Sequence, residues 1–268
     1  MRPISPYFLA AFLLAALPAI SAGAADPDQR AEEERPSVEQ LVRLFDTVVF
    51  GSEFRAVSAV SAIRKWKTPL RVIVREYGEI VTRLAGGRVS RRMEQQSLSE
   101  KYLTYVQRHL STLADLTGLK TQDVTKTRWP ANFIINFVPP LQMANPDLAD
   151  VPRGILQRLA AQGGCYFLAW PDDTGKTLLK AVIVVNKART AAKTNHCVLE
   201  EMTQSLGLPN DANPSWPSIF SNTGTVSRLS WSDRVLIQAL YDPRMTPGMA
   251  RKSALETARR IFTEHLAK

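Results

Sequence analysis

The sequence has 268 residues, and 45% of them are hydrophobic, which is enough to bury one sizeable core or one core with an appended helix. This composition excludes an intrinsically disordered protein. The formal net charge is +9, yet no run of five or more basic residues occurs, and the densest basic group is Arg88, Arg91 and Arg92.

The N-terminus has the three parts of a secretory signal peptide. Arg2 precedes an apolar run over residues 7–17, and Ala22-Gly23-Ala24 forms a small-residue cleavage site. The run is too short to cross a membrane comfortably, no other stretch is long and apolar enough, and no cysteine follows the run to carry a lipid. We therefore predict a signal peptide over residues 1–24 and a periplasmic or secreted protein that begins near Ala25.

Predicted export narrows the partners that this positive charge suggests. Loss of the single charge of Arg2 lowers the formal net charge from +9 to +8, so the mature chain stays basic. A basic protein outside the cytoplasm meets anionic envelope polymers and phospholipid headgroups more often than nucleic acid. We expect a peptide or an anionic envelope component as partner, and neither nucleic acid nor a transmembrane span.

The first predicted elements are a helix and a strand. Residues 25–36 are polar and acidic with two prolines and are expected to form a linker. Ser37 and Gln40 form a capping box that opens an amphipathic helix, and Gly51 ends it. A half-buried strand begins at about Leu70, where apolar and charged residues start to alternate.

The next stretch predicts a second helix and a second strand. Residues 86–96 are expected to be loop or frayed helix. Ser97, followed by Glu100, caps a helix that ends at Gly118, and residues 133–138 form an apolar strand that two prolines terminate.

Two further strands form a hairpin and bring in the cysteines. Residues 165–170 and 178–185 flank the turn sequence Pro-Asp-Asp-Thr-Gly. Because the chain has two cysteines and is predicted to be exported, we expect a disulfide between Cys165 and Cys197. The alternative makes Cys197 a metal ligand beside His196, and an oxidising compartment argues against it.

Residues 194–211 (TNHCVLEEMTQSLGLPND) contain a helix with two opposed faces. At about 100° per residue, its apolar residues form one stripe that should face the core: Val198, Leu199, Met202 and Leu206. The other face collects groups able to bind a metal, move a proton or form a disulfide: His196, Cys197, Glu200, Glu201 and Gln204. Gly207 ends the helix, and Leu208 returns to the core.

The C-terminal part predicts two more helices. Trp216, in a proline-rich loop, is a candidate for the lining of a cleft beside the preceding helix. Ser230 and Asp233 cap a helix through Leu240, and a last amphipathic helix starts at Thr246-Pro247, with the proline at the first helical position.

Residues 200–210 (EExxQSLGLPN) match the zinc-peptidase signature HExxHxxGxxH position for position. The spacing of that signature is kept, but carboxylate and amide side chains stand where it has histidines. The matching positions are, in order, Glu200, Glu201, Gln204, Gly207 and Asn210.

Two resemblances follow from this block and its surroundings. With PSIFS, where Phe220 stands in place of the methionine of a methionine turn, and with LSWSDRVLIQALY, residues 60–242 resemble the metzincin zinc metallopeptidases, especially matrix-metallopeptidase-like domains. That resemblance implies one α+β domain over residues 37–268, with a mixed sheet, a central signature helix, and N-terminal and C-terminal helices. The motifs HCxxEExxQxLGLPND, SIFS and LYDPRMTPGM are also similar to a family of exported proteobacterial proteins whose domain is of unknown function.

The ligand positions argue against a zinc site. The chain has only three histidines, and His109 and His265 lie far from His196 in the sequence. Glu200, Gln204 and Asn210 would supply a carboxylate and two amides, which suit calcium or magnesium better than zinc. We therefore predict no metal and no cofactor.

Two functions remain open on these residues. In the first, a non-catalytic domain binds a peptide or an envelope component through a polar surface of His196, Glu200, Gln204, Asn210 and Asp211. In the alternative, a hydrolase uses His196, Glu200 and Asp211 as ligands of an unorthodox metal site, with Glu201 as the catalytic general base.

Overall fold

The computed structural model describes residues 32–51, 61–161, 163–222 and 226–267. The predicted signal peptide over residues 1–24 and the first part of the predicted linker, residues 25–31, lie outside the described residues. Within the described ranges, no helix is both long enough and apolar enough to cross a membrane.

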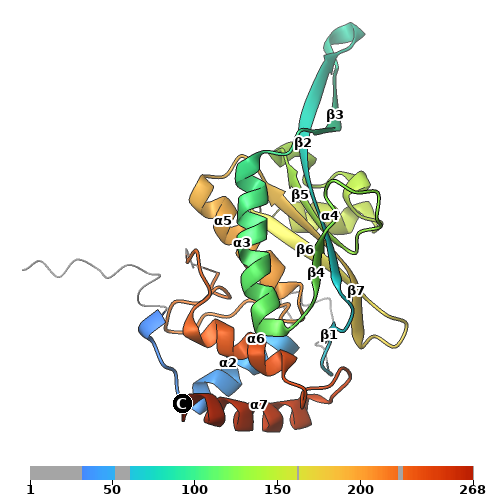
Figure 1. Ribbon diagram of the computed structural model, residues 1–268. Coiled ribbons are helices and arrows are strands. Elements are labelled where there is room, and N and C mark those ends of the chain that lie inside the picture. The colour runs from blue at the N-terminus through green and yellow to red at the C-terminus, as the bar shows by residue number, and fades with distance from the viewer. Residues whose placement is uncertain (1–31, 52–60, 162, 223–225, 268) are drawn as a thin grey trace, which may run out of the picture.

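A mixed sheet forms the centre of the protein, as expected, and seven described strands make it up (Figure 1). Its strands are β1 (Lys65–Trp66), β2 (Leu70–Arg83), β3 (Val89–Gln96), β4 (Thr121–Asp123), β5 (Phe133–Val138), β6 (Cys165–Pro171) and β7 (Thr177–Asn186). The order is β1-β7-β5-β2-β3, with β4 also beside β2 and β6 also beside β7. β3 and β6 pair antiparallel with their neighbours, and the other pairings are parallel.

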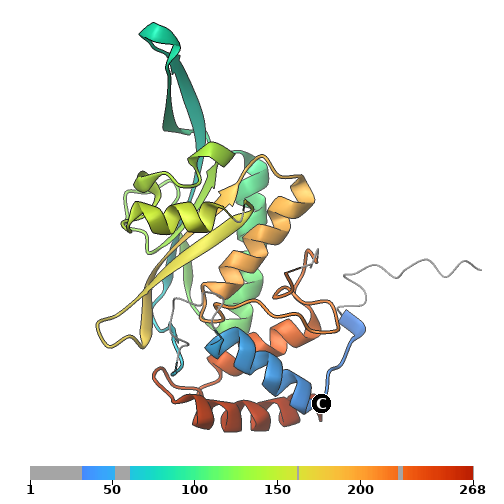
Figure 2. The ribbon, with the colours of Figure 1, turned by 180° about the vertical axis from the view of Figure 1, so that it is seen from behind.

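Helices cover both faces of this sheet. They are α2 (Val38–Phe50), α3 (Glu100–Thr117), α4 (Arg153–Ala160), α5 (Ala191–Gln204), α6 (Trp231–Tyr241) and α7 (Arg251–Leu266). α3 and α5 share the larger core with one face, and α4 covers the other face. Figure 2 shows α2, α6 and α7 grouped together at one end of the molecule. The fold is therefore α+β, with helices at both ends of the chain.

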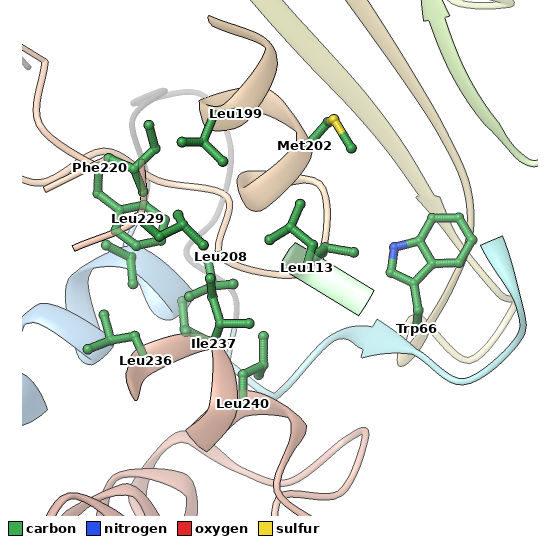
Figure 3. Packing of buried hydrophobic residues seen from close by; sticks show 14 of the residues in the cluster. Trp66, Leu113, Leu199, Met202, Leu208, Phe220, Leu229, Leu236, Ile237 and Leu240 are labelled. Atoms are coloured by element: carbon green, nitrogen blue, oxygen red, sulfur yellow. The ribbon is translucent and has the colours of Figure 1, made fainter. Parts of the chain in front are cut away.

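Alternation along the strands divides the core into two parts. On β7, Ile183 and Val185 belong to the larger core, whereas Val182 and Val184 face the smaller core under α4. Figure 3 shows part of the larger core, to which α5 and α6 both contribute side chains. The residues of these two helices labelled there are Leu199, Met202, Leu236, Ile237 and Leu240.

α2 and α7 pack against each other. The rings of Phe45 in α2 and Phe262 in α7 are both fully buried, and their centroids lie 6.0 Å apart. Arg251, at the start of α7, donates to both carboxylate oxygens of Asp46 at 2.6 Å. This bidentate pair fixes the start of α7 against α2.

Several predicted elements are confirmed. The Ser37 capping box opens α2, and the Ser230 capping box, with Asp233, opens α6. β5 covers the predicted residues 133–138, and β6 and β7 form the predicted hairpin.

The prediction of a loop or frayed helix over residues 86–96 is wrong. This segment contains β3, which pairs antiparallel with the second half of β2 after a tight turn at Ala85–Gly87. Both Gly86 and Gly87 have φ of 76°, which suits glycine in that turn. The strand has no apolar alternation because nearly all of its side chains are exposed, so no hydrophobic period marks it in the sequence.

The predicted starts of two helices are also wrong. α3 starts at Glu100 after Ser99 rather than after Ser97, and the Ser99 hydroxyl donates to Glu76 at 2.6 Å instead of capping the helix. α7 starts at Arg251 rather than at Thr246-Pro247. Residues 248–250 are held instead by backbone pairing with residues 62–63, including the bond from Gly248 N to Ile63 O at 2.8 Å.

Candidate functional site

α5 is the element on which most of the predicted site residues lie. Thr190 caps its N-terminus, and its apolar stripe is fully buried, as predicted. The helix ends at Gln204, and a turn carries the chain through Gly207, whose φ is 117°. Leu208 is fully buried, which confirms its return to the core. Burial of the apolar stripe fixes the rotation of α5 about its axis, and thereby the direction of its polar side chains.

A disulfide joins α5 to β6. The sulfurs of Cys165 and Cys197 are bonded, which confirms the predicted pairing. The alternative of Cys197 as a metal ligand is therefore wrong, because both thiols are consumed by the bond. The Arg189 guanidinium lies 3.6 Å from the Cys197 sulfur, and a Cβ at Gly164 would come within 1.9 Å of the same guanidinium. The start of β6 is thus packed tightly against the start of α5.

His196 and Glu200 form a pair on the same face of the helix. His196 Nε2 lies 3.6 Å from Glu200 Oε2, which is too long for a hydrogen bond. His196 Nδ1 lies 2.7 Å from the carbonyl oxygen of Val226 and must donate to it, so Nε2 is unprotonated when the imidazole is neutral. Burial lowers the pKa of His196, although the Val226 carbonyl opposes this effect. The neutral ring therefore turns a lone pair toward a carboxylate, an arrangement that a shared proton or a cation would stabilise.

The two amides at the former histidine positions act as tethers. The Gln204 side-chain amide donates to Asp211 Oδ1. The side-chain and backbone amides of Asn210 both donate to the carbonyl oxygen of Val48, at 3.2 and 3.1 Å. Val48 lies in the last turn of α2, where carbonyl groups lack partners within the helix. These bonds hold the chain after α5 against both α5 and α2.

The predicted residues therefore separate into two groups. His196 and Glu200 lie together beside the disulfide, with the Glu200 carboxylate within 4.8 Å of both sulfurs. Gln204, Asp211 and Asn210 lie at the other end of α5, and Glu201 is buried on the helix between these groups. His196 contacts Val226 and Glu200, whereas Asp211 accepts from Gln204 at the end of the helix.

The loop after α5 is held by a buried aspartate. Asp233 is fully buried, and it accepts from the Ser218 hydroxyl at 2.6 Å and the Ile219 amide at 3.0 Å. Burial raises its pKa, while these bonds oppose that rise. Trp216 does not line an open cleft, because its ring is buried and its indole N–H donates to Ser232 at 3.0 Å.

A feature that sequence reasoning missed lies on β6 itself. Its seven residues, CYFLAWP, include no charged side chain, and most are only partly buried. β6 pairs with β7, and no other described strand pairs with it. The uncharged run is visible in the sequence, but its place at an edge of the sheet follows only from the topology.

Fold and site together define an α+β domain in which a disulfide ties an uncharged edge strand to a helix with a polar face. The chain belongs to the family described as protein of unknown function (DUF2927), which matches residues 38–260. This match confirms the expected domain of unknown function. No curated protein sequence matches the chain.

Proposed function

We propose that this protein is a non-catalytic binding domain of the cell envelope that takes up an extended peptide along the free edge of β6. The observation that carries the proposal is the outer edge of β6, with which no described strand pairs and which lies beside the disulfide and the polar face of α5. Addition of a strand to a sheet edge is a common mode of peptide recognition, because the backbone of the ligand completes the ladder.

The backbone groups at this edge can be assigned from the ladder. Ala181, opposite Ala169, donates its amide to Asn132 on the far side of β7, whereas Asn186 donates to Gly164 on the β6 side. Because backbone groups alternate in direction along a strand, Cys165, Phe167 and Ala169 turn their N–H and C=O groups away from β7. No bond from a described residue to these outward groups is present.

The composition of β6 supports the same ligand. Natural sheets protect exposed edges with charged side chains, prolines or bulges, because an unprotected edge pairs with other chains. In β6 only the end is modified, where the register shifts between Trp170 and Pro171. Phe167 and Leu168 are partly buried apolar side chains on opposite faces, able to contact alternate side chains of an added strand.

The polar end of the edge suggests a charge preference. The Glu200 carboxylate lies within 4.8 Å of the Cys165 sulfur, at the start of β6, and His196 is beside it. A basic side chain or an amino terminus of the peptide would complement that carboxylate. The resemblance of residues 200–210 to a peptidase signature agrees with a peptide ligand. The tethering bonds of Gln204 and Asn210 support a role without catalysis.

One observation favours the hydrolase alternative. His196 Nε2 and Glu200 Oε2 lie close together, and Nε2 carries no proton when the ring is neutral. These two atoms therefore form a two-ligand set for a cation. In that reading Glu201 would be the general base.

Selection from a random peptide library on the mature chain tests the proposal. Selected peptides should bind the wild type, and Ala169→Pro should weaken binding by about tenfold or more, because it removes an outward N–H and leaves the β6–β7 bonds in place. Ala169→Ser keeps that N–H and should bind like the wild type.

Equal binding of both variants, or no selected peptide, would contradict the proposal. Cleavage of the selected peptides that is abolished by Glu201→Gln would establish the hydrolase instead.

A further inference from the structure

The second half of β2 and β3 form a two-stranded arm that projects from the body of the molecule (Figures 1 and 2). We call residues 79–93 the arm. Residues 80–92 are all exposed, so no other part of the described chain covers them. Isolated hairpins of this kind are at best marginally stable in water.

Contacts at its base hold the arm to the body. Glu79 accepts from the Gln142 side chain at 2.7 Å, and Arg91 pairs with the other carboxylate oxygen of Glu79. Gln142 is itself buried. The arm is therefore anchored at its base, and its far end is presented to the surroundings.

The exposed part of the arm, residues 80–92, combines apolar and cationic side chains. Ile80, Val81, Leu84 and Val89 are between 37% and 51% exposed, and they make up half of the large exposed apolar side chains in the described part of the chain. Exposed apolar groups concentrated in this way mark contact sites. Between residues 80 and 92 there are four arginines and no aspartate or glutamate. Arg83 and Arg88 make no ion pair with a described residue.

Charge selects the occupant of this surface. A second copy of the chain would bring the same arginines together without a carboxylate to receive them, which is unfavourable. A bilayer that contains anionic lipids offers phosphate groups to the guanidinium groups and an apolar layer to the aliphatic side chains.

We propose that the tip of the arm docks on the surface of an anionic lipid bilayer. Arg83 and Arg88 bind lipid phosphates, and Leu84 and Val89, at the turn and beside it, enter the headgroup region. This site lies on the arm and is separate from the β6 edge, so lipid binding there does not depend on peptide binding at β6.

Sedimentation of the mature chain with lipid vesicles tests the proposal. The chain should bind vesicles of phosphatidylcholine mixed with phosphatidylglycerol, bind pure phosphatidylcholine much more weakly, and lose affinity as salt is raised. Arg83→Gln with Arg88→Gln should lower affinity for the mixed vesicles by about 25-fold, since each basic group near the surface contributes about fivefold.

Leu84→Ser with Val89→Ser should also lower affinity, with the arginines intact. Matched controls change the same kinds of side chain elsewhere: Lys126→Gln with Arg128→Gln for charge, and Leu141→Ser with Leu179→Ser for exposed leucines. Both controls should bind within about threefold of the wild type.

Several results would overturn the proposal. They are no binding to the mixed vesicles, equal binding to pure phosphatidylcholine, and a loss in either control as large as in the arm variants. A change of oligomeric state in the arm variants, with vesicle binding unaffected, would assign the arm to contacts between proteins instead.

Discussion

The two antiparallel outer strands of the sheet, β3 and β6, differ in chemistry. β3 (VSRRMEQQ) carries Arg91, Arg92 and Glu94, stands away from the body and is almost fully exposed. β6 (CYFLAWP) has no charge, lies against the body and is joined to α5 by a disulfide. Charged side chains protect the first edge against pairing with other chains, and the second lacks that protection. An edge that is held rigidly and left unprotected is suited to a specific ligand.

The largest expected effect concerns the bond that holds β6. Replacing Cys165 and Cys197 together by serine should lower the free energy of unfolding by roughly 3 to 4 kcal/mol, because the bond closes a long loop in the unfolded chain. Urea unfolding of the mature chain, followed by fluorescence, measures this. Leu84→Ser on the arm should change stability by less than about 0.5 kcal/mol. A serine variant as stable as the wild type would show that β6 does not depend on its disulfide.

The next effect concerns the base of the other edge. Glu76, in β2, is buried and accepts from Ser99 N at 2.8 Å, Ser99 Oγ at 2.6 Å, Gln96 Nε2 at 2.7 Å and Lys187 Nζ at 3.3 Å. Glu76→Gln should cost about 2 to 3 kcal/mol at pH 7, because it places an amide N–H among buried donors.

The effect of Glu76→Gln should depend on pH. Burial by itself raises the pKa of Glu76, but the bonds from Ser99 and Lys187 outweigh it and hold the pKa below the usual 4.5. The stabilisation is therefore present above about pH 4.5 and lost as the pH falls through the lower folded-state pKa. A difference between wild type and variant that is constant from pH 7 to pH 3 would contradict this assignment.

A smaller effect is a pH dependence of stability that arises from His196, which lies beside β6. Burial lowers the pKa of His196 below the usual 6.5, so the unfolded chain takes up a proton before the folded chain does. Stability should be highest above pH 6.5 and should fall as the pH drops below that value. His196→Gln should reduce this slope between pH 7.5 and 5.5. Unchanged slopes in the variant would exclude His196 as a source of acid sensitivity near β6.

The last prediction is that two measurements show no effect. Glu201→Gln should leave peptide binding at β6 unchanged. The mature chain, prepared without chelator or affinity tag, should contain no stoichiometric zinc. The reason is that Gln204 and Asn210 supply amides that already serve as tethers. Elemental analysis measures the zinc content. About one zinc per chain that is lost on His196→Ala would favour the hydrolase.

Features that depend on neighbouring residues were predictable from the sequence. The capping boxes of Ser37 and Ser230 each involve a partner three residues away, and both are confirmed. The apolar stripe of α5 and the disulfide followed from helical spacing and from the presence of only two cysteines.

Features that depend on distant partners were not predictable in this way. Asn210 bonds to Val48, which lies 162 residues earlier, so no local pattern reveals its role as a tether. α7 starts late because residues 248–250 pair with residues 62–63. The uncharged run of β6 reads as a strand in the sequence, but its position at an edge depends on the order of the whole sheet.

The packing of α2 against α7 joins segments that leave the ribosome at widely separated times. Asp46 and Arg251 lie 205 residues apart, so the pair between them cannot form until the last helix has been synthesised. Contacts between such distant residues close late in folding. α2 therefore stays without its contacts to α7 until nearly the whole chain has been synthesised.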